Sequence, residues 1–136
     1  MANAAYLSAP ISRARQRTGA VMAGLAILFL SVDALGKVLR VAPVVEGTVR
    51  LGYPETVLVA LGIIELACVA AYAAPRTSVL GAILLTGYLG GAIATHVRIG
   101  SPLLTHTLFP IYVAALVWGA LYLREDRLTD LMPLRR

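Results

Sequence analysis

Residues 56–74 read TVLVALGIIELACVAAYAA, and this stretch decides the fold. Its only charged residue is Glu65, at the midpoint, and it ends before Pro75, which cannot continue a helix. About 20 apolar residues form a helix long enough to cross the hydrocarbon core of a bilayer. The stretch therefore predicts a membrane-spanning helix with one carboxylate at its centre.

Three further stretches have the same length and apolar character: residues 19–39, 77–97 and 105–123. Thr77 or Ser78 can cap the helix that follows Pro75, so residues 74–77 predict a tight turn between antiparallel spans. Gly100 and Pro102 interrupt the chain before the last span. We therefore predict an all-α fold, a transmembrane four-helix bundle.

The composition supports a membrane environment for the whole chain. Of its 136 residues, 59% are hydrophobic and 14% are charged, and the mean hydropathy is +0.80. A soluble domain carries about 25% charged residues. A small soluble domain has a large surface for its volume, so its core could not bury this many apolar residues. We therefore predict one transmembrane domain over residues 1–136, with the lipid bilayer as its first partner.

The basic residues predict the orientation in the membrane. The net charge is +5, but the arginines flank apolar blocks, which is typical of anchoring to anionic lipid and not of binding nucleic acid. The side that holds both termini carries Arg13, Arg15, Arg17, Arg76, Arg124, Arg127, Arg135 and Arg136. The other side carries Lys37, Arg40, Arg50 and Arg98. We therefore expect a bacterial plasma-membrane protein with both termini in the cytoplasm.

Two segments outside the spans have recognisable characters. Residues 40–55 form the longest connection, and we expect this segment to fold over the mouth of the bundle as a lid. Residues 123–132 mix charged and apolar side chains, which predicts a short amphipathic C-terminal tail on the membrane surface. The arginines before residue 19 resemble the start of a secretory signal, but we expect the first helix to be retained.

Ionisable residues within the spans are the main functional candidates. A carboxylate at the depth predicted for Glu65 costs about 3 kcal/mol or more, so it should face the bundle interior and be paired or protonated. Asp33 and Lys37 are four residues apart, which places them on one helix face. The three residues either form a catalytic or binding group, or they only hold the helices together.

Further candidates lie towards the outer ends of the last two spans. His96 and His106 flank a short loop and could meet there, as a pair that binds haem or a metal, moves protons or simply caps helices. A third ligand at zinc-like spacing is missing, so we assign no metal. Arg98 is either an anion-binding residue or an interfacial anchor. No motif specifies a cofactor, and haem and a quinone both stay open.

The third span combines small residues with hydroxyl groups. Gly87 and Gly91 form a GxxxG pair, which allows close approach of another helix. Tyr88 and Thr95 lie on one stripe at helical spacing. We expect these hydroxyls either to line a narrow substrate cavity or to bond a neighbouring helix.

The combined pattern resembles the DoxX-like family of small membrane proteins. The resemblance rests on Lys37, Gly62–Leu66, Pro75–Thr77, Gly81–Ala92, Ala94–Arg98 and Leu108–Pro110, and it extends from about Asp33 to Leu123. It implies a four-helix membrane fold. Some relatives are linked to redox work, including a thiosulfate:quinone oxidoreductase and a membrane complex that handles oxidative stress, and others behave as chaperones or cargo receptors. The positions Lys37, Glu65, His96 and Arg98 match, but no accepted catalytic role comes with them.

Three functional hypotheses follow. The first is an oxidoreductase-associated protein that binds a small apolar molecule, quinone-like or lipid-like, with Glu65 as the buried acid or base and Asp33 and Lys37 setting its charge. In this hypothesis His96, Arg98 and His106 gate the mouth of the cavity or recognise the molecule there. The second is a membrane scaffold or chaperone that works through a protein partner or a second copy. The third is an isomerase that uses Glu65 for proton transfer. A cavity lined by Tyr88, Thr95 and Glu65 would favour the small-molecule hypotheses, and a tightly packed interior would favour the scaffold.

Overall fold

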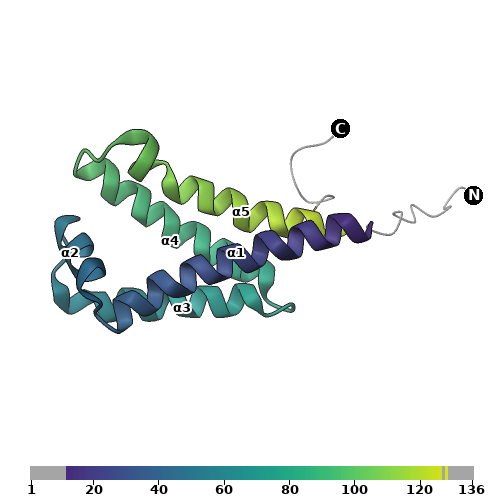
Figure 1. The fold of residues 1–136 in the computed structure, drawn as a ribbon, viewed down its shortest axis with the longest axis horizontal. Coiled ribbons are helices and arrows are strands. Elements are labelled where there is room, and N and C mark those ends of the chain that lie inside the picture. The colour runs from purple at the N-terminus through teal and green to yellow at the C-terminus, as the bar shows by residue number, and fades with distance from the viewer. Residues whose placement is uncertain (1–11, 127, 129–136) are drawn as a thin grey trace, which may run out of the picture.

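The computed structural model describes residues 12–126 and residue 128, and every regular element in this part of the chain is helical. Five α-helices follow one another: α1 (Arg13–Val38), α2 (Ala42–Arg50), α3 (Leu58–Ala73), α4 (Ser78–Arg98) and α5 (Phe109–Arg124). A short 3-10 helix, Glu55–Val57, leads into α3, and a π-helical turn, Leu103–Thr107, leads into α5. The prediction of an all-α bundle is confirmed (Figure 1).

Four helical segments are long and apolar enough to cross a membrane, as predicted: Arg13–Val38, Glu55–Ala73, Ser78–Arg98 and Leu103–Arg124. The first begins six residues before the predicted start at residue 19. Hydropathy does not reveal this extension, because five of its six residues are polar. It is stabilised at its start by Ser12, whose side chain accepts a hydrogen bond from the backbone N–H of Arg15 at 3.2 Å.

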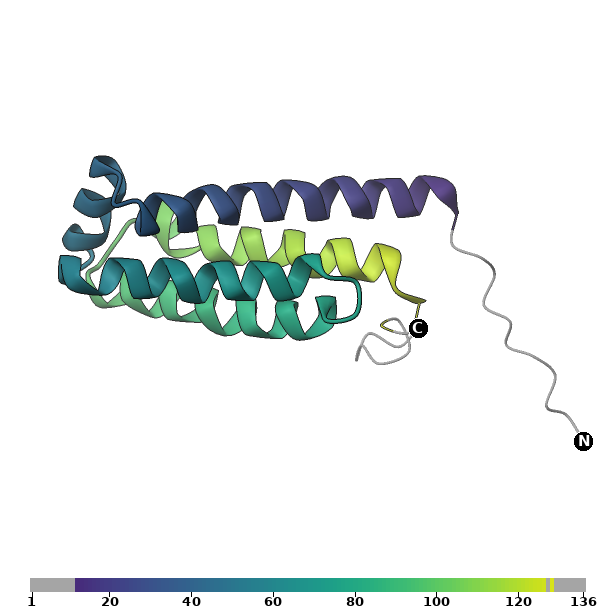
Figure 2. The same ribbon diagram turned by 90° about the horizontal axis from the view of Figure 1, so that it is seen from below.

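The four long helices form a ring in which each one packs on two neighbours. Both α1 and α4 pack on α3 and on α5 (Figure 2). One end of the bundle holds the start of α1, the turn between α3 and α4, and the end of α5; we call it the arginine end, after Arg13, Arg15, Arg17, Arg76 and Arg124. The opposite end carries α2, and we call it the α2 end.

Small residues bring the helices close together in the half towards the arginine end. A Cβ atom on Gly81 of α4 would lie 2.1 Å from the backbone nitrogen of Tyr72 of α3, so only glycine fits there. A Cβ atom on Gly19 of α1 would lie 3.0 Å from the carbonyl oxygen of Ala120 of α5. The core around them is built from Ala23, Ala26, Val69, Tyr72, Ala82, Leu85, Val117 and Leu121.

The outer surface of the bundle is apolar. Large aliphatic side chains on the outward faces are more than half exposed, including Val21, Leu28, Val32, Ile63 and Ile83. A surface of this kind is expected where lipid, and not water, surrounds the helices. The observed helices thus agree with the sequence in describing a membrane protein.

The helices part towards the α2 end. Figure 1 shows α1 and α5 side by side at the arginine end and well separated at the other. The segment predicted to act as a lid does lie across this wide end, but it contains a helix, α2, that the sequence analysis did not foresee. Pro43 does not prevent it, because proline is tolerated in the first turn. Val44 of α2 packs against Gly36 of α1, where a Cβ atom would lie 2.9 Å from Val44 Cγ2.

The predicted C-terminal amphipathic tail falls mainly on residues 127 and 129–136, which lie outside the described part of the chain. It therefore stays a prediction.

Candidate functional site

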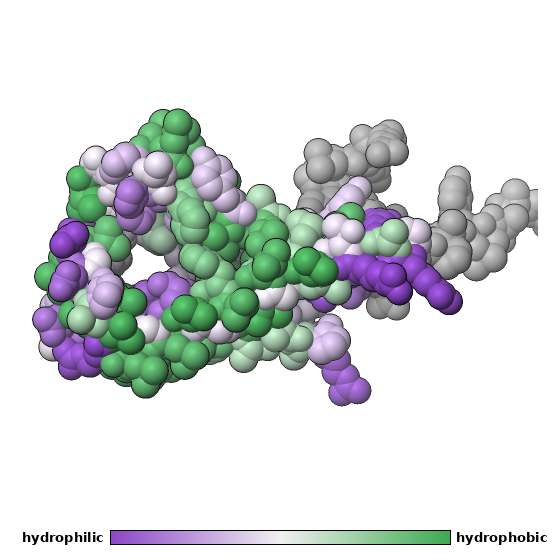
Figure 3. All heavy atoms as spheres, in the orientation of Figure 1, coloured by the Kyte–Doolittle hydropathy of each residue, from purple (hydrophilic) through white to green (hydrophobic). Residues whose placement is uncertain are grey.

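A cavity of about 860 Å³ lies where the helices part. Figure 3 shows it as a hollow next to α2, on the face where α1 and α5 separate. Most of its wall is apolar, with side chains that include Phe29, Leu30, Leu61, Leu89, Phe109 and Val113. Polar groups are gathered in two places on this wall, one towards the middle of the bundle and one near the α2 end.

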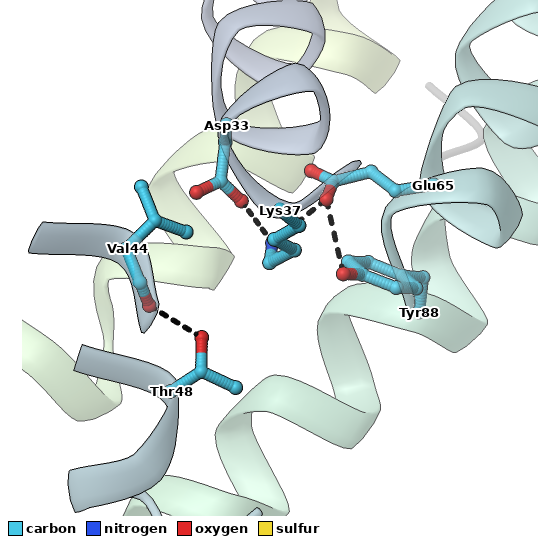
Figure 4. A network of polar contacts seen from close by, with 6 residues as sticks. All are labelled: Asp33, Lys37, Val44, Thr48, Glu65 and Tyr88. Carbon is cyan, nitrogen blue, oxygen red and sulfur yellow. Dashed lines mark hydrogen bonds and ion pairs between the residues drawn. The ribbon is translucent and has the colours of Figure 1, made fainter. Parts of the chain in front are cut away.

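The first polar group is a charged cluster contributed by three helices. Glu65 of α3 accepts two hydrogen bonds at its Oε2 atom, from Lys37 Nζ of α1 at 2.8 Å and from the Tyr88 hydroxyl of α4 at 3.0 Å. Lys37 also donates a hydrogen bond to Asp33, one turn earlier on α1. Figure 4 shows Lys37 between the two carboxylates. The structure thus brings together four of the residues singled out from the sequence.

A glycine positions this cluster. Gly62 lies one turn before Glu65 on α3, and a Cβ atom there would be 2.7 Å from the backbone oxygen of Ala34 on α1. Because Gly62 has no side chain, α3 approaches α1 closely enough for Glu65 to reach Lys37. Since Asp33 and Lys37 are spaced by one turn of α1, one ammonium serves both carboxylates.

The charges in the cluster do not balance when all three groups are ionised. Two carboxylates then share one ammonium, which leaves a net charge of −1. The Glu65 side chain is 1% exposed, and its Oε1 atom has no hydrogen-bond partner within the described residues. A buried acceptor without a donor costs about 1–3 kcal/mol. The site is therefore chemically suited to accept a proton or a hydrogen-bond donor from a bound molecule.

The second polar group surrounds the two histidines near the α2 end. The rings of His96 and His106 lie edge to face, with centroids 5.9 Å apart, and both side chains line the cavity. His96 Nδ1 bonds the Ser101 hydroxyl at 3.0 Å, and His106 Nδ1 bonds the Thr105 hydroxyl at 2.8 Å. Within the described part of the chain, no group of three His, Cys, Asp or Glu side chains is placed to hold a metal ion.

The cavity wall also contains a tyrosine that the sequence did not indicate. Tyr53, from the segment after α2, lines the cavity and shares a hydrogen bond of 2.8 Å with the Thr95 hydroxyl. Thr95 was predicted either to line a cavity or to bond a neighbouring helix, and the structure places it in the cavity wall on α4. Tyr53 has no helical periodicity to mark it, because it follows a turn at Gly52, and its position depends on how α2 folds back.

Arg98 was predicted either to recognise a ligand at the mouth or to anchor the helix at the membrane interface, and its observed contacts are with the lid. Its guanidinium donates a hydrogen bond of 2.7 Å to the backbone oxygen of Leu51, at the end of α2. It also packs against Gly52, which has a φ of 87° and where a Cβ atom would lie 3.0 Å from Arg98 Nη2. Arg98 is not among the residues that line the cavity, so its described role is to hold the chain after α2.

Comparison with known proteins places the chain in a family. A family model described as the DoxX-like family matches residues 21–120, which include α3 and α4 entirely, most of α1 and α5, and the whole charged cluster. No curated protein and no solved structure matches the chain. The match, together with the four apolar helices, identifies an integral membrane protein. The chain belongs to the DoxX-like family.

Proposed function

We propose that this protein binds a small, mainly apolar molecule in the cavity and anchors one polar group of that molecule at Glu65. The observation that carries the proposal is Glu65 itself, a buried carboxylate in the cavity wall. Its Oε2 atom accepts two hydrogen bonds, and its Oε1 atom has no partner among the described residues. The cavity volume of about 860 Å³ falls within the range of small-molecule sites, roughly 300–1,000 Å³. Such a space also supports the small-molecule hypotheses over the scaffold.

The chemistry of the cluster indicates the kind of polar group. Asp33 and Glu65 supply acceptors, and their combined charge exceeds that of Lys37. A hydroxyl or an amine would therefore be held as a donor, whereas a carboxylate would be repelled. Lys37 and Tyr88 hold Glu65 Oε2 in place, so they would position the carboxylate and leave Oε1 for the ligand.

A photoreactive octanol that carries a diazirine tests this proposal. In lipid vesicles, the probe should label wild-type peptides around Tyr88 and Glu65, and excess plain octanol should suppress the labelling. Replacing Glu65 with glutamine halves the acceptor capacity and removes the charge, so labelling should fall by about tenfold, equivalent to about 1.4 kcal/mol.

Glu125→Gln is the matched control, because it makes the same chemical change at the arginine end, away from the cavity. It should label like the wild type. Equal, competable labelling of Glu65→Gln and wild type would contradict the proposed anchoring role, provided both proteins remain monodisperse after extraction.

An association with redox chemistry is a narrower form of the proposal. It is favoured by His96 and His106, whose rings lie in the cavity wall with their Nδ1 atoms already bonded to hydroxyls. Visible spectra of the purified protein, in air and after a chemical reductant, test it. A band that shifts on reduction would support the redox role. Absorbance from Trp118 and the tyrosines alone would rule out tightly bound haem or flavin.

A further inference from the structure

We infer that the cavity opens sideways into the bilayer between α1 and α5, and that its ligand is a single-chain amphiphile whose apolar chain stays in this opening. The inference rests on the proposed function and adds the class of ligand and its route of entry. The head would be a hydroxyl or an amine. The chain would contact Phe29 and Phe109 at the boundary between cavity and lipid.

The first support is the way α1 and α5 separate. At the arginine end they are tied together, since the Arg15 guanidinium donates a hydrogen bond of 2.7 Å to the backbone oxygen of Tyr122. The last aromatic contact between them is Phe29 with Phe109, whose ring centroids are 5.4 Å apart. Because α5 begins at Phe109, the chain beyond this pair faces α1 only as the π-helical turn Leu103–Thr107. The hollow in Figure 3 lies on the face where α1 and α5 separate.

The two phenylalanines lie both on the cavity wall and on the outer surface of the bundle. Phe29 is 44% exposed and Phe109 is 42% exposed, yet both also line the cavity. An aromatic pair that contacts the cavity on one side and the surroundings on the other marks the edge of an opening. The cavity is therefore continuous with the outer surface between α1 and α5.

The depth of this edge indicates that it faces acyl chains. Phe29 lies nine residues before the end of α1 at Val38, which is about 13 Å along the helix axis. The headgroup layer on each side of a bilayer is only about 5–7 Å thick. An opening that reaches to Phe29 therefore extends past the headgroups into the hydrocarbon region.

The order of charged groups inside the opening indicates which kind of polar head group the ligand carries. Asp33 is 40% exposed, whereas Glu65 is 1% exposed, so a molecule that enters meets Asp33 first and Glu65 behind it. Both are acceptors, with Lys37 between them (Figure 4). A neutral donor or a cation can move along this path, and an anionic head is disfavoured at each step.

The α2 end offers a second route into the cavity, but polar contacts keep that end closed. Arg40 pairs with Glu55 at 2.8 Å, and Tyr53 bonds Thr95 at 2.8 Å. Arg98 adds its bond to Leu51. The bonds of Thr95 and Arg98 tie the segment after α2 to α4, and the pair of Arg40 with Glu55 joins the two ends of the connection that contains α2. At the side opening, Phe29 and Phe109 are joined by an apolar ring contact.

Two photoreactive hexadecanols in lipid vesicles test the inference. One carries the diazirine beside the hydroxyl and the other carries it near the middle of the chain. The first should label Glu65 or Tyr88, and the second should label α1 and α5 near Phe29 and Phe109. The corresponding fatty acid, with a carboxylate head, should label the cavity about tenfold less.

Blocking the opening chemically is the second part of the test. In a Cys68→Ala background, Phe29→Cys is modified with a bulky lipid-soluble maleimide, which should reduce labelling of the cavity by the first probe about tenfold. Leu28→Cys is the matched control, because Leu28 is the neighbouring residue, is 63% exposed and does not line the cavity. The same modification there should leave labelling unchanged.

The outcomes separate the two proposals. Cavity labelling that survives modification of Phe29→Cys, or that rises when Glu55→Gln loosens the α2 end, would overturn the side opening and leave the proposed function intact. Chain labelling away from α1 and α5 would also overturn it. If neither octanol nor hexadecanol gives competable labelling of the cavity in the wild type, the proposed function itself fails.

Discussion

At the scale of single residues, Lys37 holds the site together, because it is the only cation in a cluster with two carboxylates. Its side chain is 13% exposed, and its two ion-pair partners lie on different helices. Removing one member of a buried ion pair leaves the other charge without compensation, and this is more damaging than losing an exposed pair.

We therefore expect Lys37→Met to lower the free energy of unfolding by about 3–5 kcal/mol. Equilibrium unfolding in detergent measures the change. Arg40→Gln removes the exposed pair with Glu55 and should cost no more than about 1 kcal/mol. The double variant Lys37→Met, Glu65→Gln should recover part of the loss. Equal costs for Lys37→Met and Arg40→Gln would show that the cluster is not a stabilising unit.

Part of this site was predictable and part was not. The pairing of Asp33 with Lys37 follows from their spacing on one helix, and the inward position of Glu65 follows from the cost of exposing it to lipid. The division of labour between the two Glu65 oxygens depends on the rotation of α3 and α4 about their axes. Hydropathy does not encode that rotation. A bond from Tyr88 to a neighbouring helix was one of two expectations, but the choice of Glu65 Oε2 as its acceptor could not be predicted. The lack of a partner for Oε1 among the described residues could not be predicted either.

At the scale of helices, glycines control which parts of the bundle close and which stay open. The sequence suggested Gly87 and Gly91 as a contact for another helix, yet a Cβ atom at either would have no neighbour within 4 Å, and both line the cavity. The close contacts are at Gly81, Gly62 and Gly19 instead. A GxxxG spacing marks a smooth helix face, but whether that face meets a helix or a cavity is decided by the rest of the bundle.

Gly81→Ala should prevent correct packing of α3 against α4. Its new methyl group would overlap the backbone of Tyr72, which cannot move aside without shifting the whole helix. Gly90→Ala is the control: it has open space, and alanine gains about 1 kcal/mol over glycine in a helix. Size-exclusion profiles and melting temperatures in detergent measure both. A Gly81→Ala protein as stable as Gly90→Ala would contradict the observed contact.

At the scale of the whole molecule, the four spans were predictable because each bilayer crossing demands a long apolar run. The helix α2 was not, because it is short and contains Pro43 and Gly47, which usually interrupt helices. Its place over the cavity depends on the packing of Val44 against Gly36, a contact between segments that sequence periodicity does not connect.

The distribution of arginines leads us to expect the arginine end in the cytoplasm and α2 on the outside. Single cysteines in a Cys68→Ala background test this orientation. Arg76→Cys, in the turn between α3 and α4, should react with a membrane-impermeant maleimide only after the cells are permeabilised. Glu46→Cys, exposed on α2, should react in intact cells. The reverse pattern would mean that the molecule is inserted the other way round.

The separation of α1 from α5 also has a mechanical consequence. The described part of the molecule is narrow at the arginine end and broad at the α2 end, so this part displaces more lipid from one leaflet than from the other. In a flat membrane both leaflets have the same area, and the mismatch is left as elastic stress. Many copies that share one orientation relieve that stress when the leaflet around α2 lies on the convex side of a bent membrane.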